Sequence, residues 1–308
     1  MTKGDKCDKC SARAVYFQKY SGSCLCMEHF DADLQRKVKE TIRETGLFGR
    51  GVRIAVALDG GKDSVVLAFV LRRLFMNRPD IEMVAVTVDQ GIECRIRALE
   101  HSKAAAEKMR LEQIVLSFGD SYGITIDEIA RGGEDRGDEN QSDEKRGDEN
   151  REEGNRSEEK SICAVCSGMR MKLLQKAAKD LDADVLATGQ NLDDLAEAVM
   201  GCYLRGEPAG LPGASPGPAQ FERESVPVIR PLIRVPESEV ALYATIHDLL
   251  PENLEACPYR EKMRTEIGLA LDEFESGHPG TKYSLYRSME RMIDLLPEGL
   301  RDGAGQSL

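Results

Sequence analysis

The clearest chemical signal in the chain is a glycine turn between an apolar run and a predicted helix. The run Ile54 to Leu58 leads into Asp59-Gly60-Gly61-Lys62-Asp63-Ser64, and a helix is predicted over 64–75. At such a turn, backbone N–H groups and the positive helix end can hold an anion, and the lysine adds charge. The pattern is neither the Walker-type GxxxxGK[ST] nor the GxGxxG of dinucleotide sites. It predicts a phosphate site of another kind, with an ordinary strand-to-helix turn as the alternative.

Two other predicted strands also end in polar turns. The strand 83–89 ends in Asp89-Gln90-Gly91-Ile92, and the strand 183–189 leads from Gly189 into Gln190-Asn191-Leu192-Asp193-Asp194. Asp193 and Asp194 could hold Mg²⁺ or assist proton transfer. As acids at a helix N-terminus they could equally do no more than stabilise the helix dipole.

Four residues near the start of the chain have the spacing of a tetrahedral zinc site. Cys7 and Cys10 form one pair, and Cys26 and His29 form a second pair of the same spacing. Thiolate and imidazole ligands suit zinc, and a polar segment of this length needs such a staple to fold. We therefore expect a zinc module, with Cys24 as an alternative to Cys26.

A second cysteine pair, Cys163 and Cys166, opens a helix predicted near 163–181. The helix dipole favours thiolates there, and the i, i+3 spacing places both on one face. Two thiolates do not complete a metal site, so a third ligand is needed, and Cys202 and Cys257 are the candidates. A zinc site, a redox pair and buried structural thiols are the alternatives. We assign Cys94 a structural role.

The order of the predicted elements indicates the fold class. Strands at 54–58, 83–89, 113–118 and 183–189 alternate with helices at 64–75, 96–109, from 125, 163–181 and 192–204. This alternation predicts an α/β fold with a parallel sheet and right-handed crossovers. Helices are also predicted at 31–45 and over most of the C-terminal part.

The charge of the chain is concentrated in one segment. Residues 132–160 hold twelve acidic and six basic residues, which is −6 of the chain's −12, and contain RGDEN twice. The segment has no aliphatic or aromatic residue, so we expect a disordered insert. The rest of the chain is only mildly acidic and could still carry a basic face for a nucleic acid. The Gly/Pro-rich stretch 207–219 is expected to be a second mobile connection.

These observations predict three parts. We expect a zinc module at 1–30, an α/β domain at 31–250 that contains the acidic insert, and a helical segment at 251–308. No run approaches the roughly twenty apolar residues of a membrane helix, and the N-terminus is not a signal peptide. We expect a soluble, cytoplasmic protein with no membrane partner. Four of its nine cysteines form two CxxC pairs, which favours metal ligands or redox groups over disulfides.

The motifs together resemble one known family. The glycine turn is similar to the SGGxDS loop of the PP-loop ATP pyrophosphatases. The zinc module, DGGKDS, CAVCSGMRMKLLQKAA, TGQNLDD, ACPYR and PGTKYSLYRSMERM occur in the order found in TtuA-type tRNA 2-thiouridine synthetases. The chain departs from that family in having Asp59 in place of Ser and Gln190 in place of His. It also lacks the usual C-terminal zinc module with two more CxxC pairs.

The resemblance implies an adenine nucleotide alpha hydrolase-like fold, ATP with Mg²⁺, and a 4Fe-4S cluster with one iron left open for hydrosulfide. It implies catalytic roles for Lys62, Asp63 and Asp194. It implies ATP binding by Asp59, Gly60, Gly61, Lys62, Asp63, Ser64, Asp89, Gly91, Gly189 and Asp193. It selects Cys163, Cys166 and Cys257 as the cluster ligands, and Cys7, Cys10, Cys26 and His29 for zinc.

The implied activity is the adenylation of a uridine C2 oxygen in tRNA, followed by its replacement with sulfur. A ubiquitin-like sulfur carrier protein or free sulfide would be the donor, and a homodimer is expected. Basic residues that could contact tRNA are Arg95, Arg97, Arg170, Lys172, Arg260, Lys262, Arg264, Lys282, Arg287 and Arg291. The competing hypotheses are a PP-loop paralogue with a different thiolation substrate and a non-catalytic Fe-S or zinc-binding tRNA-modification subunit.

Overall fold

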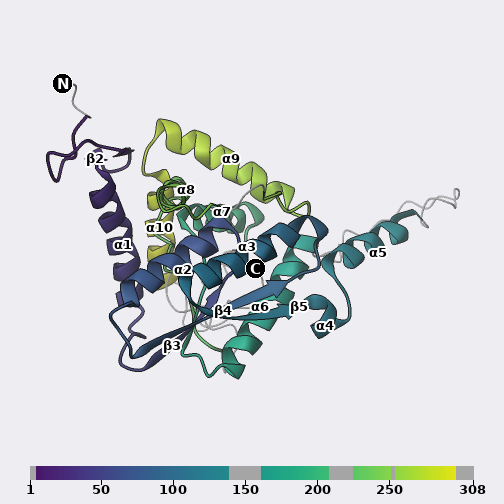
Figure 1. Cartoon of the computed structure of the whole chain (residues 1–308). Coiled ribbons are helices and arrows are strands. Elements are labelled where there is room, and N and C mark those ends of the chain that lie inside the picture. The colour runs from purple at the N-terminus through teal and green to yellow at the C-terminus, as the bar shows by residue number, and fades with distance from the viewer. Residues whose placement is uncertain (1–4, 139–160, 208–224, 251–253, 296–308) are drawn as a thin grey trace, which may run out of the picture.

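A five-stranded parallel sheet forms the centre of the molecule (Figure 1). The computed structural model describes residues 5–138, 161–207, 225–250 and 254–295. The strands are β3 (Val52–Ala57), β4 (Ile81–Asp89), β5 (Glu112–Ser117), β6 (Val185–Ala187) and β7 (Val228–Ile229). Their order across the sheet is β5-β4-β3-β6-β7, and every neighbouring pair is parallel. The predicted α/β fold with a parallel sheet is confirmed.

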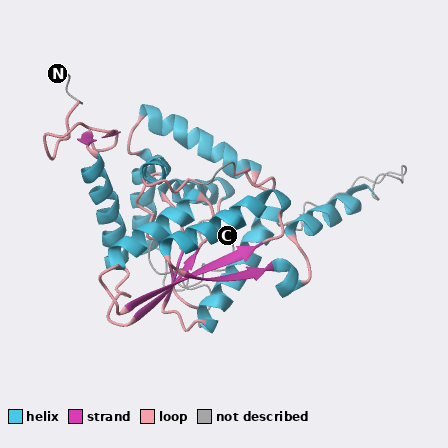
Figure 2. Cartoon of the chain, viewed as in Figure 1, coloured by secondary structure: helices cyan, strands magenta, loops and turns pink. Residues whose placement is uncertain are grey.

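Helices lie on both faces of this sheet and beyond its edges (Figures 1 and 2). They are α1 (Met27–Glu44), α2 (Lys62–Phe75), α3 (Ile96–Met109), α4 (Phe118–Tyr122), α5 (Ile126–Asp138), α6 (Ile162–Asp180), α7 (Leu192–Arg205), α8 (Glu237–Ile246), α9 (Lys262–Gly277) and α10 (Thr281–Leu295), with a 3-10 turn η1 at Glu93–Arg95. Among these described helices, none is long and apolar enough to cross a membrane.

Alternation along the strands explains why both faces are covered. In β3, Ile54 and Val56 belong to a core that also contains residues of α1, α2 and α8, whereas Ala55 faces a second core built with α6. Because both sides are buried, the strands are almost continuously apolar, as parallel strands usually are. This is why the strands could be recognised as apolar runs in the sequence.

The observed elements differ from the predicted ones chiefly at their ends. Helix α1 begins at Met27, four residues before the predicted start, and helix α2 begins at Lys62. Helix α5 continues to Asp138, so residues 132–138 of the predicted disordered insert are helical, and α5 extends from the body in Figure 1. Residues 139–160 and 208–224 lie outside the described part, so most of both predicted connections are not addressed.

The C-terminal helices pack on α7. Val199 and Cys202 of α7 share an apolar cluster with Tyr286 and Met289 of α10, and Ala196 contacts a smaller cluster that includes α9. The close approach of α9 depends on Gly268, where an added Cβ would lie 2.7 Å from the Glu197 carboxylate. These contacts bring the end of the chain to the helix that follows β6.

A buried polar network joins the N-terminal segment to the rest. The hairpin β1 (Tyr16–Gln18) and β2 (Ser23–Leu25) precedes α1. Gln18 donates to Asp33 at 2.8 Å and to Glu239 of α8 at 3.1 Å. Lys37 lies 2.6 Å from Glu239 and 3.3 Å from Asp33, and all four side chains are buried. Arg36 also lies 2.8 Å from Asp33, and Tyr20 donates to Glu239 at 2.7 Å, so Lys37 shares Asp33 with Arg36 and is the cation paired with Glu239.

This network predicts a large effect of Lys37→Ala on stability. Removing the ammonium group leaves the buried Glu239 carboxylate without its cation, so the free energy of unfolding should fall by about 3–5 kcal/mol. Urea unfolding followed by circular dichroism measures this loss. Lys39→Ala, on the exposed side of the same helix, is the matched control and should change the free energy by less than about 0.5 kcal/mol. A loss of equal size in both variants would contradict the assigned role.

Candidate functional site

The predicted turns that follow β3 and β6 meet at the point where the order of the strands reverses. Strands β3 and β6 are neighbours, yet the chain leaves them for opposite halves of the sheet. Ligands of open α/β sheets bind outside the carboxyl ends of such a strand pair. An added Cβ at Gly189 would lie 2.9 Å from the Ser64 backbone nitrogen, and Asn191 Nδ2 donates to Asp63 Oδ1 at 2.9 Å. The turns after β3 and β6 are therefore in direct contact.

The first turn has the backbone conformation that only glycine adopts without strain. Gly60 has a φ of +78°, and an added Cβ would collide with the Ala98 carbonyl oxygen. A ring nitrogen of His101 lies 2.8 Å from the Gly60 oxygen and holds the turn against α3. Gly61 is the N-cap of α2, so the turn presents the start of that helix. This arrangement can bind an anion.

Asp59 already interacts with the donors of this turn. Its Oδ1 accepts from Gly61 N at 2.9 Å and from Ser64 Oγ at 2.6 Å. Burial favours the neutral acid, but Arg170, the Ser64 hydroxyl, Arg95 and the Gly61 amide outweigh burial and lower the pKa of Asp59. The carboxylate therefore stays ionised at neutral pH.

Lys62 is held at the start of α2 by two carboxylates. Its Nζ lies 3.1 Å from Asp63 Oδ2 and 2.7 Å from Glu237 Oε1 at the start of α8. Burial acts against the charged lysine, yet these carboxylates raise the pKa of Lys62 overall. Glu237 was not predicted from the sequence. Its only local signal is its place in the first turn of a helix after Pro236, which is common for acids without a functional role.

The acidic pair of α7 is matched by cations from the C-terminal helices. Asp193 accepts from Lys282 of α10 and from the Glu237 backbone amide at 2.8 Å. Asp194 lies 2.7 Å from Arg264 of α9. Lys282 and Arg264 were predicted as tRNA contacts, and their pairing with the acids could not be read from the sequence. Each carboxylate of the pair therefore has a cationic partner in this arrangement.

Two carboxyl groups of the site have raised pKa values. Burial is the main cause for Asp63 and is only partly offset by Lys62 and Asn191. Burial also raises the pKa of Asp194 against the opposing effect of Arg264. Asn191 and Asp194 in addition form a capping box at the start of α7. Carboxyls tuned in this way can hold a proton closer to neutral pH than a free aspartic acid.

The third predicted turn lies at the end of β4. Asp89 Oδ1 accepts from the Gly91 amide at 2.9 Å, and Gly91 has a φ of +66°. A Cβ at Gly91 would lie 2.4 Å from Thr125 Cγ2, so the turn packs closely on the start of α5. Asp89 and Gly91 are thus at the same edge of the sheet as the first two turns, one strand away from β3.

Gln190, which stands where the resembling family has His, contacts a buried arginine. Its Oε1 accepts from Arg230 Nε at 2.5 Å, and Arg230 is 4% exposed. Burial lowers the pKa of Arg230 to about 10, so it remains charged. A neutral amide oxygen is a suitable partner for this guanidinium, whereas a protonated imidazole would repel it. Gln190 is therefore part of the frame of the site.

Of the two candidates for a third thiolate, only Cys257 shares a core cluster with Cys166. Both pack on the core between the sheet and α6, together with Cys94, whereas Cys202 is buried between α7 and α10. Cys163 lies in the first turn of α6, which Ser161 caps. Burial raises the pKa of Cys166, while Arg170 acts in the opposite direction. Cys163 and Cys257 both act electrostatically on Cys166, so three partly exposed thiols from two segments lie in one region that fits a cluster.

The N-terminal cysteines and His29 form a compact set. The atoms of Cys7, Cys10, Cys26 and His29 all lie within 4.8 Å of one another. The Sγ atoms of Cys10 and Cys26 are 3.7 Å apart, and His29 Nδ1 lies 3.5 Å from Cys7 Sγ and 3.2 Å from Cys26 Sγ. Tetrahedral zinc requires separations of about 3.8 Å between sulfurs and about 3.5 Å between sulfur and nitrogen. The set therefore fits zinc.

The neighbours of this set agree with that interpretation. Burial raises the pKa of Cys7, but backbone amides of Cys26, Lys9 and Cys10 outweigh it and bring the pKa to about 6, which favours the thiolate. Cys24, the predicted alternative ligand, is buried in β2, and its amide donates to Asp8. The structure groups Cys26 with the other three ligands and leaves Cys24 out.

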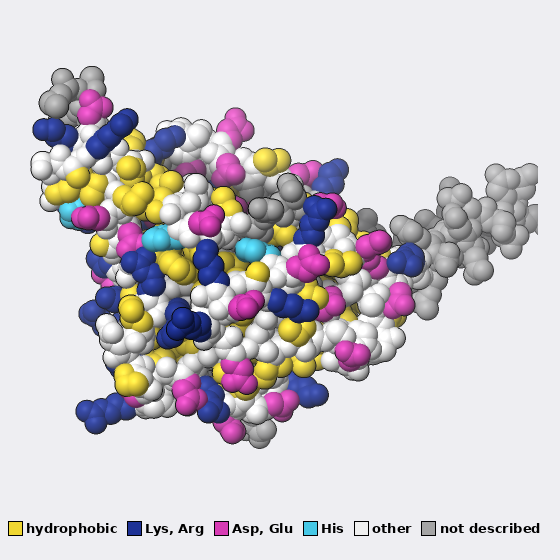
Figure 3. Space-filling view, viewed as in Figure 1, with side chains coloured by type: hydrophobic (Ala, Val, Ile, Leu, Met, Phe, Trp, Pro, Cys, Tyr) yellow, Lys and Arg dark blue, Asp and Glu magenta, His cyan; other side chains and the backbone are white. Residues whose placement is uncertain are grey.

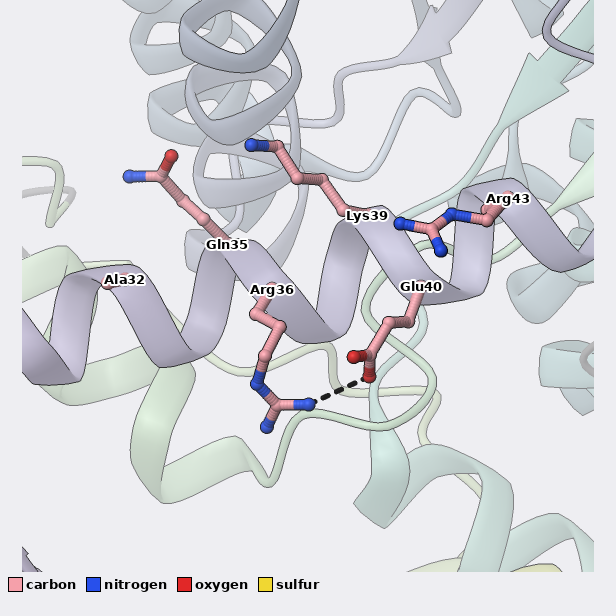
Figure 4. Close-up of a pocket in the computed structure, with 6 residues that line it drawn as sticks. All are labelled: Ala32, Gln35, Arg36, Lys39, Glu40 and Arg43. Atoms are coloured by element: carbon pink, nitrogen blue, oxygen red, sulfur yellow. Dashed lines mark hydrogen bonds and ion pairs between the residues drawn. The ribbon is translucent and has the colours of Figure 1, made fainter.

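Other surface features do not resemble a reaction centre. Figure 4 shows a hollow on α1 lined by Ala32, Gln35, Arg36, Lys39, Glu40 and Arg43. Its residues come from one helix, and Arg36 pairs with Glu40 at 2.8 Å. The face in Figure 3 mixes basic and acidic side chains. Five predicted tRNA contacts pair with carboxylates: Arg95 and Arg170 with Asp59, Arg260 and Arg264 with Glu197 of α7, and Lys282 with Asp193.

Comparison with known proteins gives matches along nearly the whole chain. Residues 144–253 match the PP-loop domain model, and residues 6–31 match the model of the N-terminal LIM domain of 2-thiouridine synthetase TtuA. The tRNA 2-thiolation protein NcsA of Haloferax volcanii is 33% identical over 304 residues, which cover 94% of this chain and 87% of that protein. Cytoplasmic tRNA 2-thiolation protein 1 of Drosophila sechellia is 30% identical over 287 residues, covering 92% and 76%.

A solved structure shows the same similarity. The U34-tRNA thiolase NcsA from Methanococcus maripaludis, determined with its [4Fe-4S] cluster, superposes with a TM-score of 0.78 at 30% identity. The match covers 96% of this chain and 89% of that one. The resemblance drawn from the motifs is confirmed by these matches.

The zinc set predicts one metal ion per chain at the N-terminus. Cys26→Ser should lose this zinc, because three ligands hold the ion far more weakly than four. Cys24→Ser should keep it. Zinc measured by mass spectrometry on anaerobically purified variants tests this, and retention of zinc by Cys26→Ser would show that Cys26 is not a ligand.

The raised pKa of Asp63 predicts a stability effect with a defined pH dependence. Ionised Asp63 disfavours folding above its folded-state pKa, and this cost disappears as the pH falls through that value toward the ordinary one. Asp63→Asn should therefore raise the melting temperature at pH 8 by a few degrees, with a smaller gain at pH 4. Asp80→Asn is the control of opposite sign, because Arg78 lowers the pKa of Asp80 to about 2. A lower melting temperature for Asp63→Asn at pH 8 would contradict the prediction.

Proposed function

This chain belongs to the family of PP-loop tRNA 2-thiolation proteins, and we propose that it is an ATP-dependent enzyme that replaces the C2 oxygen of a tRNA uridine with sulfur. Its relatives include a tRNA 2-thiolation protein and a U34-tRNA thiolase with a [4Fe-4S] cluster. The match to the PP-loop domain supports ATP as the activating substrate.

One contact supports this proposal more than any other. Arg170 of α6 lies 3.8 Å from Asp59 in the turn formed by residues 59–64, the phosphate turn. Cys166 is four residues earlier on the same helix, which is about one helical turn, or roughly 6 Å. A nucleotide in the turn and a sulfur source at the cysteines would therefore be close enough to act on one substrate atom.

The proposed reaction has two steps. In the first, the C2 oxygen of the uridine attacks the α-phosphorus of ATP, and pyrophosphate leaves. In the second, a hydrosulfide attacks C2, the bond from C2 to oxygen breaks, and AMP departs with that oxygen. When bound at Cys163, Cys166 and Cys257, a 4Fe-4S cluster would supply the hydrosulfide. Zinc at the N-terminal set would have a structural role.

The residues of the chain would bind and orient ATP. The Gly60-Gly61 turn and the start of α2 would face the polyphosphate, and Lys62 would offset the charge of the departing pyrophosphate. Ser64 would donate its hydroxyl, while Asp89, Gly91 and Gly189 would border the nucleotide. Mg²⁺ would accompany ATP and share the charge of its phosphates.

Asp63 and Asp194 would manage protons during the reaction. The N3 proton of the uridine must leave when its C2 oxygen becomes a nucleophile, and N3 must regain a proton, the one that the S–H group loses, when AMP departs. Both carboxyls have pKa values raised by burial, which suits such an exchange. Asn191 holds Asp63 and Asp194 in register, because it donates to the first and accepts the N-terminal amides of α7 beside the second.

We propose tRNA, together with a ubiquitin-like sulfur carrier protein or free sulfide, as the partners of this site. A homodimer in the cytoplasm fits the family to which the chain belongs. The names of the Drosophila relatives support the cytoplasmic location.

A second candidate function is that of a non-catalytic metal-binding subunit. The observation that favours it is Asp59, which places a carboxylate on the donors that a phosphate would use. Formation of AMP with tRNA under anaerobic, iron-loaded conditions separates the two candidates, because only the enzyme forms AMP.

For the enzyme, we expect AMP formation that depends on tRNA and 2-thiouridine in the product, detected by mass spectrometry of nucleosides. Cys257→Ala should abolish thiolation and the broad iron-sulfur absorbance. Cys202→Ala is the matched control, because this cysteine lies in another core cluster, and it should keep the absorbance. Retention of the iron-sulfur absorbance by Cys257→Ala would show that Cys257 is not a ligand. The absence of AMP formation by the wild-type chain would refute the enzymatic proposal.

A further inference from the structure

The Asp59 carboxylate accepts hydrogen bonds from two donors of the phosphate turn. Its Oδ1 accepts from the Gly61 amide at 2.9 Å and from the Ser64 hydroxyl at 2.6 Å. Helix α2 begins at Lys62, so both donors belong to the positive end of this helix. An oxygen of a bound phosphate would accept hydrogen bonds from donors in these positions.

The other carboxylate oxygen faces two guanidinium groups. Asp59 Oδ2 lies 3.8 Å from Arg170 of α6 and 3.9 Å from Arg95, the last residue of the 3-10 turn η1. Two hydrogen-bond donors on one oxygen and two cations beside the other are the surroundings expected of a bound anion. The Asp59 side chain is 36% exposed, so it has space toward solvent into which it can turn.

We propose that the Asp59 carboxylate is an internal competitor of phosphate for the Gly61 amide and the Ser64 hydroxyl. The carboxylate must leave both donors before the phosphates of ATP or pyrophosphate can bind. This inference rests on the proposed function and adds a restraint built into the same site. When Asp59 leaves, Arg95 and Arg170 lose their acidic partner and can face the incoming phosphate.

A role for Asp59 as a magnesium ligand fits the contacts less well. A carboxylate that binds Mg²⁺ directs its oxygens to the metal and away from cations. Here Oδ1 accepts two hydrogen bonds, and Oδ2 faces two arginines that would repel a divalent ion. The two roles differ in sign, because a competitor weakens phosphate binding while a metal ligand strengthens it when Mg²⁺ is present.

Calorimetric titration of the full chain with pyrophosphate, in EDTA and again with Mg²⁺, tests the inference. Asp59→Ser removes the carboxylate, and Asp59→Asn keeps its shape and one oxygen but removes its charge. Both variants should bind pyrophosphate on the order of tenfold more tightly than the wild type. Asp80→Asn changes the net charge by the same amount at a remote ion pair and should bind as the wild type does. Melting temperatures establish that each variant is folded.

The outcomes separate this inference from the proposed function. Tighter binding by both Asp59 variants, or binding by them alone, supports the competitor. Wild-type binding without a gain in either variant overturns the competitor and leaves the proposed function standing. Weaker binding by Asp59→Ser only with Mg²⁺ also overturns it and makes Asp59 a metal ligand. If neither the wild type nor any variant binds pyrophosphate, both proposals fall.

Discussion

Three carboxylates at the carboxyl edge of the sheet, those of Asp59, Asp193 and Asp194, lie beside cations that the fold brings from distant parts of the chain. Arg95 and Arg170 serve Asp59, Lys282 serves Asp193, and Arg264 serves Asp194. An unpaired charge in such a partly buried position would cost several kcal/mol, so these pairs restrict where the helices can lie. The helices α6, α9 and α10 therefore form part of the site although their sequences contain no phosphate motif.

The same constraint explains which features could be predicted from the sequence. Glycines that need a left-handed backbone, such as Gly60 and Gly91, follow apolar runs and mark strand ends without knowledge of the tertiary structure. The parallel sheet was likewise predictable because its strands are buried on both sides. The spacing of Cys7, Cys10, Cys26 and His29 was sufficient to predict a set that the structure brings within 4.8 Å.

The charge partners were not predictable in this way. Lys282 is separated from Asp193 by 89 residues, and Arg264 from Asp194 by 70, so no local pattern connects them. In the sequence, Lys282 and Arg264 are isolated basic residues on predicted helices, and they could not be distinguished from residues that contact tRNA. The prediction that residues 132–138 are disordered was wrong, because a polar segment without apolar residues can extend an established helix for two turns. Helix ends depend on such continuation more than on composition.

The arrangement of charges also connects the two halves of the site, which are the phosphate turn and the thiols of Cys163, Cys166 and Cys257. Asp59 accepts from the phosphate turn through one oxygen and faces Arg170 through the other, and Arg170 partly offsets the burial that raises the pKa of Cys166. Any ligand that draws Arg170 away from Asp59 therefore changes the electrostatic surroundings of the thiols as well as of the turn. Asp59 thus influences both the phosphate turn and the thiols, the latter through one guanidinium group.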